Sequence, residues 1–209
     1  MIPVEDLDKW RNQYPTASHA DQVAFHSRIW DSNPHQNHFD ADECALAIDH
    51  VKPTSVVELG GWDGELAGRM LTDYQDIRCW INVELCQEAA QSGRWQHPGR
   101  YHAPHLEGWY WAVEWKADLF VASHVIEHLT AHDLSCVIAA TNAPAMFLDA
   151  PLFDAPTNWS GTTTTHILEL GWEGVTDLMA RHGYTPTWAH DHQTAPSSGD
   201  HARACLYQR

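Results

Sequence analysis

A glycine-rich turn between a short strand and a helix constrains this chain more than any other segment. Residues 55–66 read SVVELGGWDGEL, in which a β-branched run ends on Glu58 and an amphipathic stretch follows the turn. The glycines of the turn are Gly60, Gly61 and Gly64. A strand, a tight glycine turn and a helix open a doubly wound α/β sheet, and such a turn is where the sheet binds a nucleoside-like ligand.

The acids around this turn discriminate between two nucleoside ligands. A dinucleotide places a pyrophosphate over the spacing G-x-G-x-x-G, but Leu59 stands where the first glycine is needed. Glu58 and Asp63 would also add negative charge beside a pyrophosphate. S-adenosylmethionine has a sulfonium and an ammonium but no phosphate, so the acids favour it as the cofactor. The alternative is a turn that only joins a strand to a helix.

Composition excludes several classes of protein. The 209 residues fit one domain with a short extension, and 28 acids against 12 Lys and Arg give a formal charge of −16. This balance argues against DNA or RNA as a partner, because phosphate binding needs a basic surface. Five scattered cysteines without a CxxC pair disfavour a zinc knuckle or a disulfide scaffold. With no signal peptide and no membrane-spanning run, we expect a cytoplasmic protein without a membrane partner.

Strand and helix patterns alternate along the chain. We expect a polar helical extension over 1–39 and one domain over 40–209. Strands are expected at 56–58, 77–85, within 101–115, and at 117–123, 144–151, 184–190 and 202–208. Helices are expected between Asp40 and Pro53, at 63–74 and 86–95, at 133–142 with Asp133 as its cap, and before Gly183. This order predicts an α/β, Rossmann-like, seven-stranded, mostly parallel sheet with a C-terminal antiparallel hairpin, since no helix separates the last two strands.

Three segments together resemble the class I S-adenosylmethionine-dependent methyltransferases over roughly residues 40–209. They are VVELGGWDG, then Glu84 at the end of the second strand, 20 residues after Gly64, and DLFVASHVIEHL at 118–129. A weaker match is His166, followed by a helix that ends in Arg181-His-Gly-Tyr. The resemblance implies methyl transfer from S-adenosylmethionine to an oxygen or nitrogen of a small-molecule acceptor.

The resemblance also implies roles for individual residues around the cofactor. Glu84 is expected to accept hydrogen bonds from both ribose hydroxyls, and Glu58 to orient the turn or meet the ammonium. Leu85 would pack on the adenine. The residues that would let the backbone approach the methionyl part, or reach the cleft from the fourth strand, are Gly60, Gly61, Gly64, Ser123 and His124.

Catalysis of methyl transfer needs a general base only when the acceptor is an alcohol or a phenol. The candidates are His124, His128 and His166, with His124 preferred. Asp149, at the end of the fifth strand, is expected to orient the acceptor or to close a turn. The N-terminal extension and the polar loop 151–165 would form a roof over the acceptor site.

Two departures from the family pattern leave alternatives open. Trp62 replaces the central glycine of the first motif, so a non-catalytic, cofactor-binding or interaction module is an alternative. The acid expected after the third strand has no clear counterpart among His102, His105 and Glu107. His124, Glu127 and His128 also match H-x-x-E-H, a zinc metallopeptidase signature. This alternative explains neither the glycine turn nor Glu84, and no metal is expected.

Overall fold

The computed structural model describes residues 13, 17–32, 41–96, 101–102, 116–151, 168, 170–193 and 201–209. Several expectations lie outside these residues: most of the extension over 1–39, the Asp40 cap, the loop beyond Pro151, and the positions of His105, Glu107 and His166. In the part of the chain that is described, no helix has the length and apolar character needed to cross a membrane.

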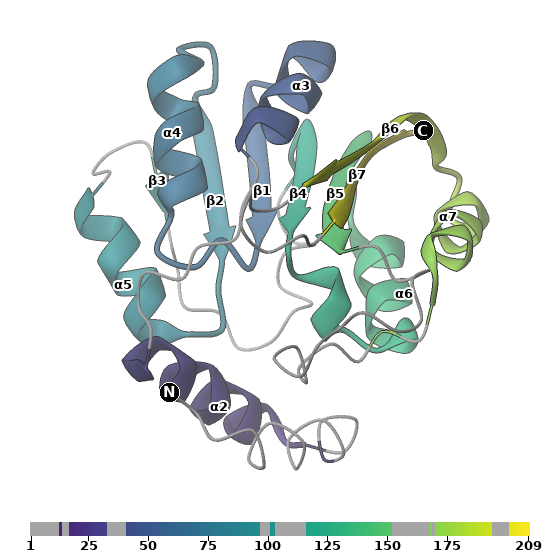
Figure 1. Cartoon of the computed structure of the whole chain (residues 1–209). Helices are drawn as coiled ribbons and strands as arrows, with labels where there is room; N and C mark the ends of the chain where they lie inside the picture. Colours follow the sequence, from purple (N-terminus) through teal and green to yellow (C-terminus); the bar gives the residue numbers. More distant parts are fainter. Residues whose placement is uncertain are drawn as a thin grey trace.

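A single mixed sheet forms the centre of the molecule (Figure 1). Its strands are β1 (Ser55–Leu59), β2 (Cys79–Val83), β3 (Tyr101–His102), β4 (Leu119–Ser123), β5 (Ala145–Pro151), β6 (Thr185–Gln193) and β7 (His201–Gln208), in the order β3-β2-β1-β4-β5-β7-β6. The pairs from β3 to β5 are parallel, and β7 is antiparallel to both β5 and β6. The α/β Rossmann-like prediction and the C-terminal antiparallel hairpin are confirmed.

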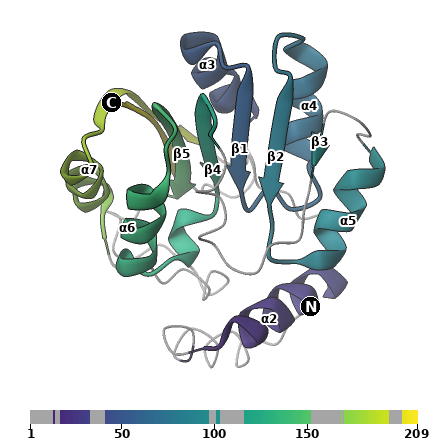
Figure 2. The ribbon, with the colours of Figure 1, turned by 180° about the vertical axis from the view of Figure 1, so that it is seen from behind.

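Helices cover both faces of the sheet (Figures 1 and 2). They are α3 (Ala41–Val51), α4 (Glu65–Asp73), α5 (Gln87–Gln96), α6 (Ala131–Ala140) and α7 (Trp172–Arg181). Alternate strand residues point to opposite faces, so two apolar clusters form. Val57, Phe120 and Leu148 lie in the cluster that includes α6 and α7. Val56 and Phe147 lie in the cluster that includes α3 and α4.

Helix α2 (His19–Ser32) crosses the edge of the sheet at which the parallel strands end (Figures 1 and 2). Phe25 is 2% exposed, and the Ser27 hydroxyl donates to Glu88 of α5 at 3.0 Å. Because the carboxyl ends of parallel strands carry the ligand sites of such sheets, α2 is placed over the region where a site is expected.

The prediction that Asp133 caps α6 is wrong, because the helix begins two residues earlier, at Ala131. The cap is Thr130: its side-chain oxygen accepts from the Asp133 backbone N–H at 3.1 Å. The Thr130 hydroxyl in turn donates to the Asp133 carboxylate at 2.6 Å. Asp133 is therefore the third residue of the helix and stabilises the cap rather than forming it.

Thr130→Ala is expected to lower the free energy of unfolding by about 1 kcal/mol, the usual cost of losing a Thr N-cap. Urea denaturation would measure the change. Thr72→Ala is the matched control, because the Thr72 hydroxyl donates to the Gly68 carbonyl inside α4 and caps no helix end. Equal losses in the two variants would contradict the capping role.

Candidate functional site

The glycine turn between β1 and α4 is closely packed against its surroundings. Gly60 and Gly64 have φ of 70° and 83°, in the left-handed region that favours glycine. A Cβ on Gly60 would overlap Cγ2 of Val125, which follows β4. A Cβ on Gly61 would lie 2.6 Å from Oε2 of Glu58. The turn therefore packs the end of β1 closely against the segment that follows β4.

Asn82 holds this turn from the neighbouring strand β2. Its Oδ1 accepts from the Gly61 backbone N–H at 2.8 Å, and its Nδ2 donates to the Trp62 carbonyl at 3.2 Å. The side chain is fully buried. Asn82 was not among the predicted site residues, although a lone amide inside the apolar run of β2 was a signal that it has buried polar partners.

Glu84 binds the same turn one step further along. It is 4% exposed; its Oε2 accepts from the Trp62 N–H at 2.9 Å and its Oε1 from the Cys86 N–H at 2.8 Å. These contacts tie the residue that precedes α5 to the glycine turn. Each carboxylate oxygen can accept a second hydrogen bond, so the arrangement leaves capacity for hydroxyl donors. Leu85, the next residue, is buried in the apolar core.

Glu58 lies under the turn in the interior. It is 3% exposed, and its Oε2 accepts from the indole N–H of Trp80 at 2.7 Å. Burial raises the pKa of Glu58 to about 8, against the opposing effect of the Trp80 hydrogen bond, and Glu84 and Asp63 raise it further. Burial likewise raises the pKa of Glu84 to about 7, although its backbone hydrogen bonds oppose this.

This group of acids favours a cation. In the described residues no Lys or Arg forms an ion pair with Glu58 or Glu84. Buried carboxylates without a cationic partner bind protons more strongly than usual, and a bound cation would restore their charge. An anionic group such as a pyrophosphate would be repelled by the ionised acids and would favour their protonated forms.

Trp62 occupies the middle of the turn with a φ of 50°, which is unusual for a residue with a side chain. Its backbone N–H and carbonyl are both bound, by Glu84 and Asn82 respectively. These two hydrogen bonds hold the conformation that a glycine would adopt at lower cost. The indole itself is partly buried.

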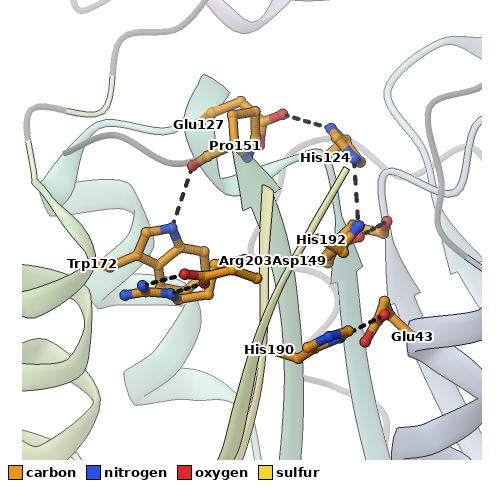
Figure 3. Close-up of polar contacts among 11 residues, drawn as sticks. Glu43, His124, Glu127, Asp149, Pro151, Trp172, His190, His192 and Arg203 are labelled. Atoms are coloured by element: carbon orange, nitrogen blue, oxygen red, sulfur yellow. Dashed lines mark hydrogen bonds and ion pairs between the residues drawn. The ribbon is translucent and has the colours of Figure 1, made fainter. Parts of the chain in front are cut away.

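A second polar group lies at the ends of β4, β5 and β6 (Figure 3). At its centre is Asp149, which is fully buried. Its Oδ1 is 2.9 Å from Nε2 of His192, and its Oδ2 accepts from the Ser123 hydroxyl at 3.2 Å. His124 has a φ of 54°, and its backbone N–H donates to the Asp149 carbonyl at 2.7 Å.

The His124 ring faces two carboxylates. Its Nδ1 is 3.6 Å from Oε1 of Glu127, and its Nε2 is 3.9 Å from Oδ2 of Asp149. Burial lowers the pKa of His124, but the two acids outweigh burial, and the pKa is raised above its usual value. The side chain is 15% exposed. His124 is thus a strengthened base that remains accessible.

Other histidines surround this group. Nε2 of His128 lies 3.9 Å from Oε1 of Glu127, and the His128 side chain is 27% exposed. His26, on α2, has its pKa lowered to about 3 by burial and then by His128. Helix α2 therefore brings a neutral imidazole over the residues that follow β4. His166 lies outside the described residues.

The geometry does not support the zinc peptidase alternative. That signature needs two histidines four residues apart on one face of an α-helix. Here residues Ile126–His128 form a single 3-10 turn, η3, and His124 precedes it in a left-handed conformation. Among the residues that can be described, no group of three or more His, Cys, Asp or Glu side chains is placed to hold a metal.

The predicted residues fall into two neighbouring sets. Glu58, Gly60, Gly61, Gly64, Glu84 and Leu85 surround the glycine turn, and Ser123 and His124 end β4 beside it. The contact between Gly60 and Val125 joins the sets. His192 was missed, because the expected strand 184–190 stops short of it, whereas β6 runs to Gln193. Its partner Asp149 is 43 residues away in the sequence, so no local signal was available.

Comparison with known proteins gives matches among solved structures only, since neither a family model nor a curated protein matches the chain. The structure is similar to 1,6-didemethyltoxoflavin-N1-methyltransferase from Burkholderia thailandensis, solved with 1,6-didemethyltoxoflavin and S-adenosylhomocysteine bound. The TM-score is 0.65 at 16% identity, over 93% of this chain and 92% of that one.

Two further similar structures are an O-methyltransferase and an N-methyltransferase. Mitomycin 7-O-methyltransferase MmcR has a TM-score of 0.59 at 17% identity over 81% of this chain and 52% of that one, so the chain spans about half its length. N-methyltransferase NodS from Bradyrhizobium japonicum has a TM-score of 0.59 at 10% identity, over 80% of this chain and 92% of that one. The chain therefore has the fold of the class I S-adenosylmethionine-dependent methyltransferases.

Proposed function

We propose that this protein transfers a methyl group from S-adenosylmethionine to an oxygen or nitrogen of a small-molecule acceptor. The observation that carries the proposal is the pair of buried acids, Glu58 and Glu84, that flank the glycine turn at the ends of adjacent strands. A cofactor with a sulfonium, an ammonium and a ribose diol suits such acids, and a pyrophosphate does not. The similar O- and N-methyltransferases support the same class of reaction.

In this proposal the residues of the turn bind the cofactor. Glu84 accepts from the ribose hydroxyls with the lone pairs that its backbone N–H donors leave available. The cofactor ammonium is attracted to the acids around the turn. Glu58, which is buried beside the turn, also orients it. The glycines let the backbone approach the methionyl part, Leu85 packs on the adenine, and Ser123 and His124 reach the cleft from the end of β4.

The chemical step is an in-line displacement at the sulfonium methyl. A lone pair on the acceptor forms a bond to the methyl carbon, the carbon–sulfur bond breaks, and its electron pair stays on sulfur. The protein contributes chiefly by alignment and by excluding water. His124 is the preferred general base, with His128 and His166 as the other candidates.

The partners follow from the charge and the fold. With a net charge of −16 the chain is unsuited to nucleic acid, and SHVI stands where DNA amino-methyltransferases carry an N/D-P-P-Y/F-like run after the fourth strand. We propose a small, neutral or cationic acceptor and a cytoplasmic location.

Glu84→Gln is expected to weaken binding of S-adenosylhomocysteine by roughly tenfold or more, because hydrogen bonds to a charged group contribute about 1.5–3 kcal/mol. Titration calorimetry would measure the affinity, with thermal denaturation of the ligand-free variant to separate loss of contact from loss of fold. Glu173→Gln, an exposed acid at the start of α7, is the matched control. An unchanged affinity would remove Glu84 from the site, and a wild-type protein that does not bind would remove the proposed function.

A binding module without turnover is the second candidate, favoured by Trp62 in the place of a glycine. Incubation with S-adenosylmethionine that carries a labelled methyl group and an extract of small metabolites distinguishes the two. Transfer of the label to any metabolite excludes the non-catalytic alternative, whereas binding without transfer supports it.

A further inference from the structure

Asp149 links two histidines that reach it from different strands (Figure 3). His124 follows β4 and His192 belongs to β6, the outer strand of the C-terminal hairpin. A carboxylate only accepts hydrogen bonds, so Nε2 of His192 carries the proton in the 2.9 Å contact. The His192 side chain is 7% exposed and the Asp149 side chain is fully buried. This contact is shielded from water and therefore strongly orienting.

We propose that His192, acting through Asp149, is a positioning residue for His124, and that the acceptor methylated in this site is an alcohol or a phenol. The proposal rests on the proposed methyltransferase function and deepens it. It assigns a role to the C-terminal hairpin, which supplies no other residue to the site among the described residues.

The geometry of Asp149 supports the positioning role. His192 holds one carboxylate oxygen and the Ser123 hydroxyl holds the other, so the plane of the carboxylate is set from two sides. The Asp149 carbonyl also binds the His124 backbone N–H at 2.7 Å, which keeps His124 in its left-handed conformation. Both the backbone and the ring of His124 are thus placed relative to Asp149.

The charge around His124 favours a hydroxyl acceptor. Asp149 and Glu127 are buried acids that face opposite nitrogens of the His124 ring. Two such carboxylates would hold an amine in its protonated form, which has no lone pair for the methyl group. A neutral hydroxyl escapes this effect, and the same acids raise the pKa of His124 and make it a better proton acceptor.

His124 is the only base that this methyl transfer needs. The acceptor O–H proton moves to the neutral imidazole while the oxygen forms its bond to the methyl carbon. The carbon–sulfur bond breaks and its electron pair converts the sulfonium to a thioether. The products are a methyl ether, S-adenosylhomocysteine and an imidazolium, which returns its proton to water after product release.

The titration of His124 is the direct test, because it needs no acceptor. The titratable groups around it are Glu127 on η3, Asp149 on β5 and His192 on β6, with His128 and then His26 of α2 beyond. NMR spectra of the ¹⁵N-histidine-labelled protein would report the pKa of His124 and the tautomer of His192. We expect a lower His124 pKa in Asp149→Asn, which loses the attracting charge. We expect a higher one in His192→Gln, because the variant loses the imidazole whose charge lowers the His124 pKa.

His190→Gln is the matched control. His190 lies two residues before His192 on the same strand, stacks on it at 6.4 Å between ring centroids, and pairs with a different acid, Glu43, at 2.8 Å. It should leave the His124 pKa unchanged. Equal effects of the His190 and His192 variants, or an unprotonated Nε2 of His192 in the wild-type protein, would overturn the positioning role. The tautomer of His192 in the wild-type protein can overturn the positioning role even if a variant does not fold.

The acceptor class is tested with S-adenosylmethionine carrying a ¹³C methyl group and an extract of small metabolites. The ¹³C shift of the product identifies an O-methyl or an N-methyl group; O-methyl products support the proposal and N-methyl products alone overturn it. With an O-methylated product in hand, His192→Gln should lower kcat about tenfold or more with little change in KM. Binding of S-adenosylhomocysteine should persist in this variant. Absence of transfer to any metabolite would contradict the methyltransferase function itself.

Discussion

Gly60→Ala is expected to lower the free energy of unfolding by roughly 2–5 kcal/mol and to abolish binding of S-adenosylhomocysteine. Two costs add in this estimate: about 1–2 kcal/mol for a side chain in the left-handed region and about 1–3 kcal/mol for overpacking. The φ of Gly60 is 70°, and its new Cβ would overlap the buried Val125 side chain. Val125 precedes η3 and lies in the apolar core, so it has little room to move.

Gly183→Ala separates these two costs. Gly183 has a φ of 83°, but nothing lies within 4 Å of the position of its Cβ. This variant should lose only about 1–2 kcal/mol, the conformational part. Urea denaturation of both variants measures the difference, and a loss at Gly183 as large as that at Gly60 would show that the contact with Val125 is unimportant.

The second large effect is a loss of stability of the ligand-free protein as pH rises. The folded pKa of Glu58 is raised to about 8 and that of Glu84 to about 7, both by burial. The unfolded chain titrates these acids near about 4.3. The folded state therefore binds more protons than the unfolded state, and stability falls by on the order of a few kcal/mol as pH rises from about 4.3 through the folded pKa values.

The window for this measurement is about pH 6.5 to pH 8. His124, whose pKa is raised, also lowers stability as pH rises there, so the difference between the wild-type protein and Glu58→Gln isolates the acid. Below pH 6.5 His26 acts in the opposite sense, because its pKa is lowered to about 3 and the unfolded chain then binds the additional proton. Melting temperatures over this window should fall in the wild-type protein and fall less in Glu58→Gln, which has no ionisable group there. Wild-type and variant curves of equal slope would contradict the buried acid.

Cofactor binding should oppose the rise in the pKa values of Glu58 and Glu84 that burial causes. A cationic ligand favours the ionised acids, so binding releases protons near neutral pH. Calorimetry in buffers of different ionisation enthalpy would detect the released protons, and the number released should be smaller in Glu58→Gln. No difference between buffers would indicate that the ligand does not deprotonate Glu58 and Glu84.

Local patterns determined the elements that surround the turn. The run from Val56 to Gly64 specifies a strand and a tight turn within a dozen residues, and glycine is required there by a positive φ that short-range sterics dictate. The alternation of strands and helices likewise predicted a mostly parallel sheet, because parallel neighbours need a crossover. Both depend on interactions between residues close together in the chain.

Boundaries were predicted less well where a neighbour in space sets them. α6 begins at Ala131 rather than Asp133, because the preceding 3-10 turn ends at His128 with Leu129 as its C-cap, which leaves Thr130 to form the cap of α6. β6 continues to Gln193, because β7 supplies a partner as far as His201. A strand continues only as far as its neighbouring strand provides hydrogen-bond partners. Residues close together in the sequence do not specify where that neighbour ends.

The sequence by itself determined the strand, the glycine turn and the acids whose negative charge favours a cationic ligand. Only the tertiary structure decided that Asn82 and Glu84 hold the Gly61-Trp62 backbone from the adjacent strand, and that His192 reaches Asp149 from the hairpin. The reason is physical: backbone conformation follows from neighbouring residues, whereas a buried hydrogen bond between strands depends on register, which the packing of the whole sheet selects.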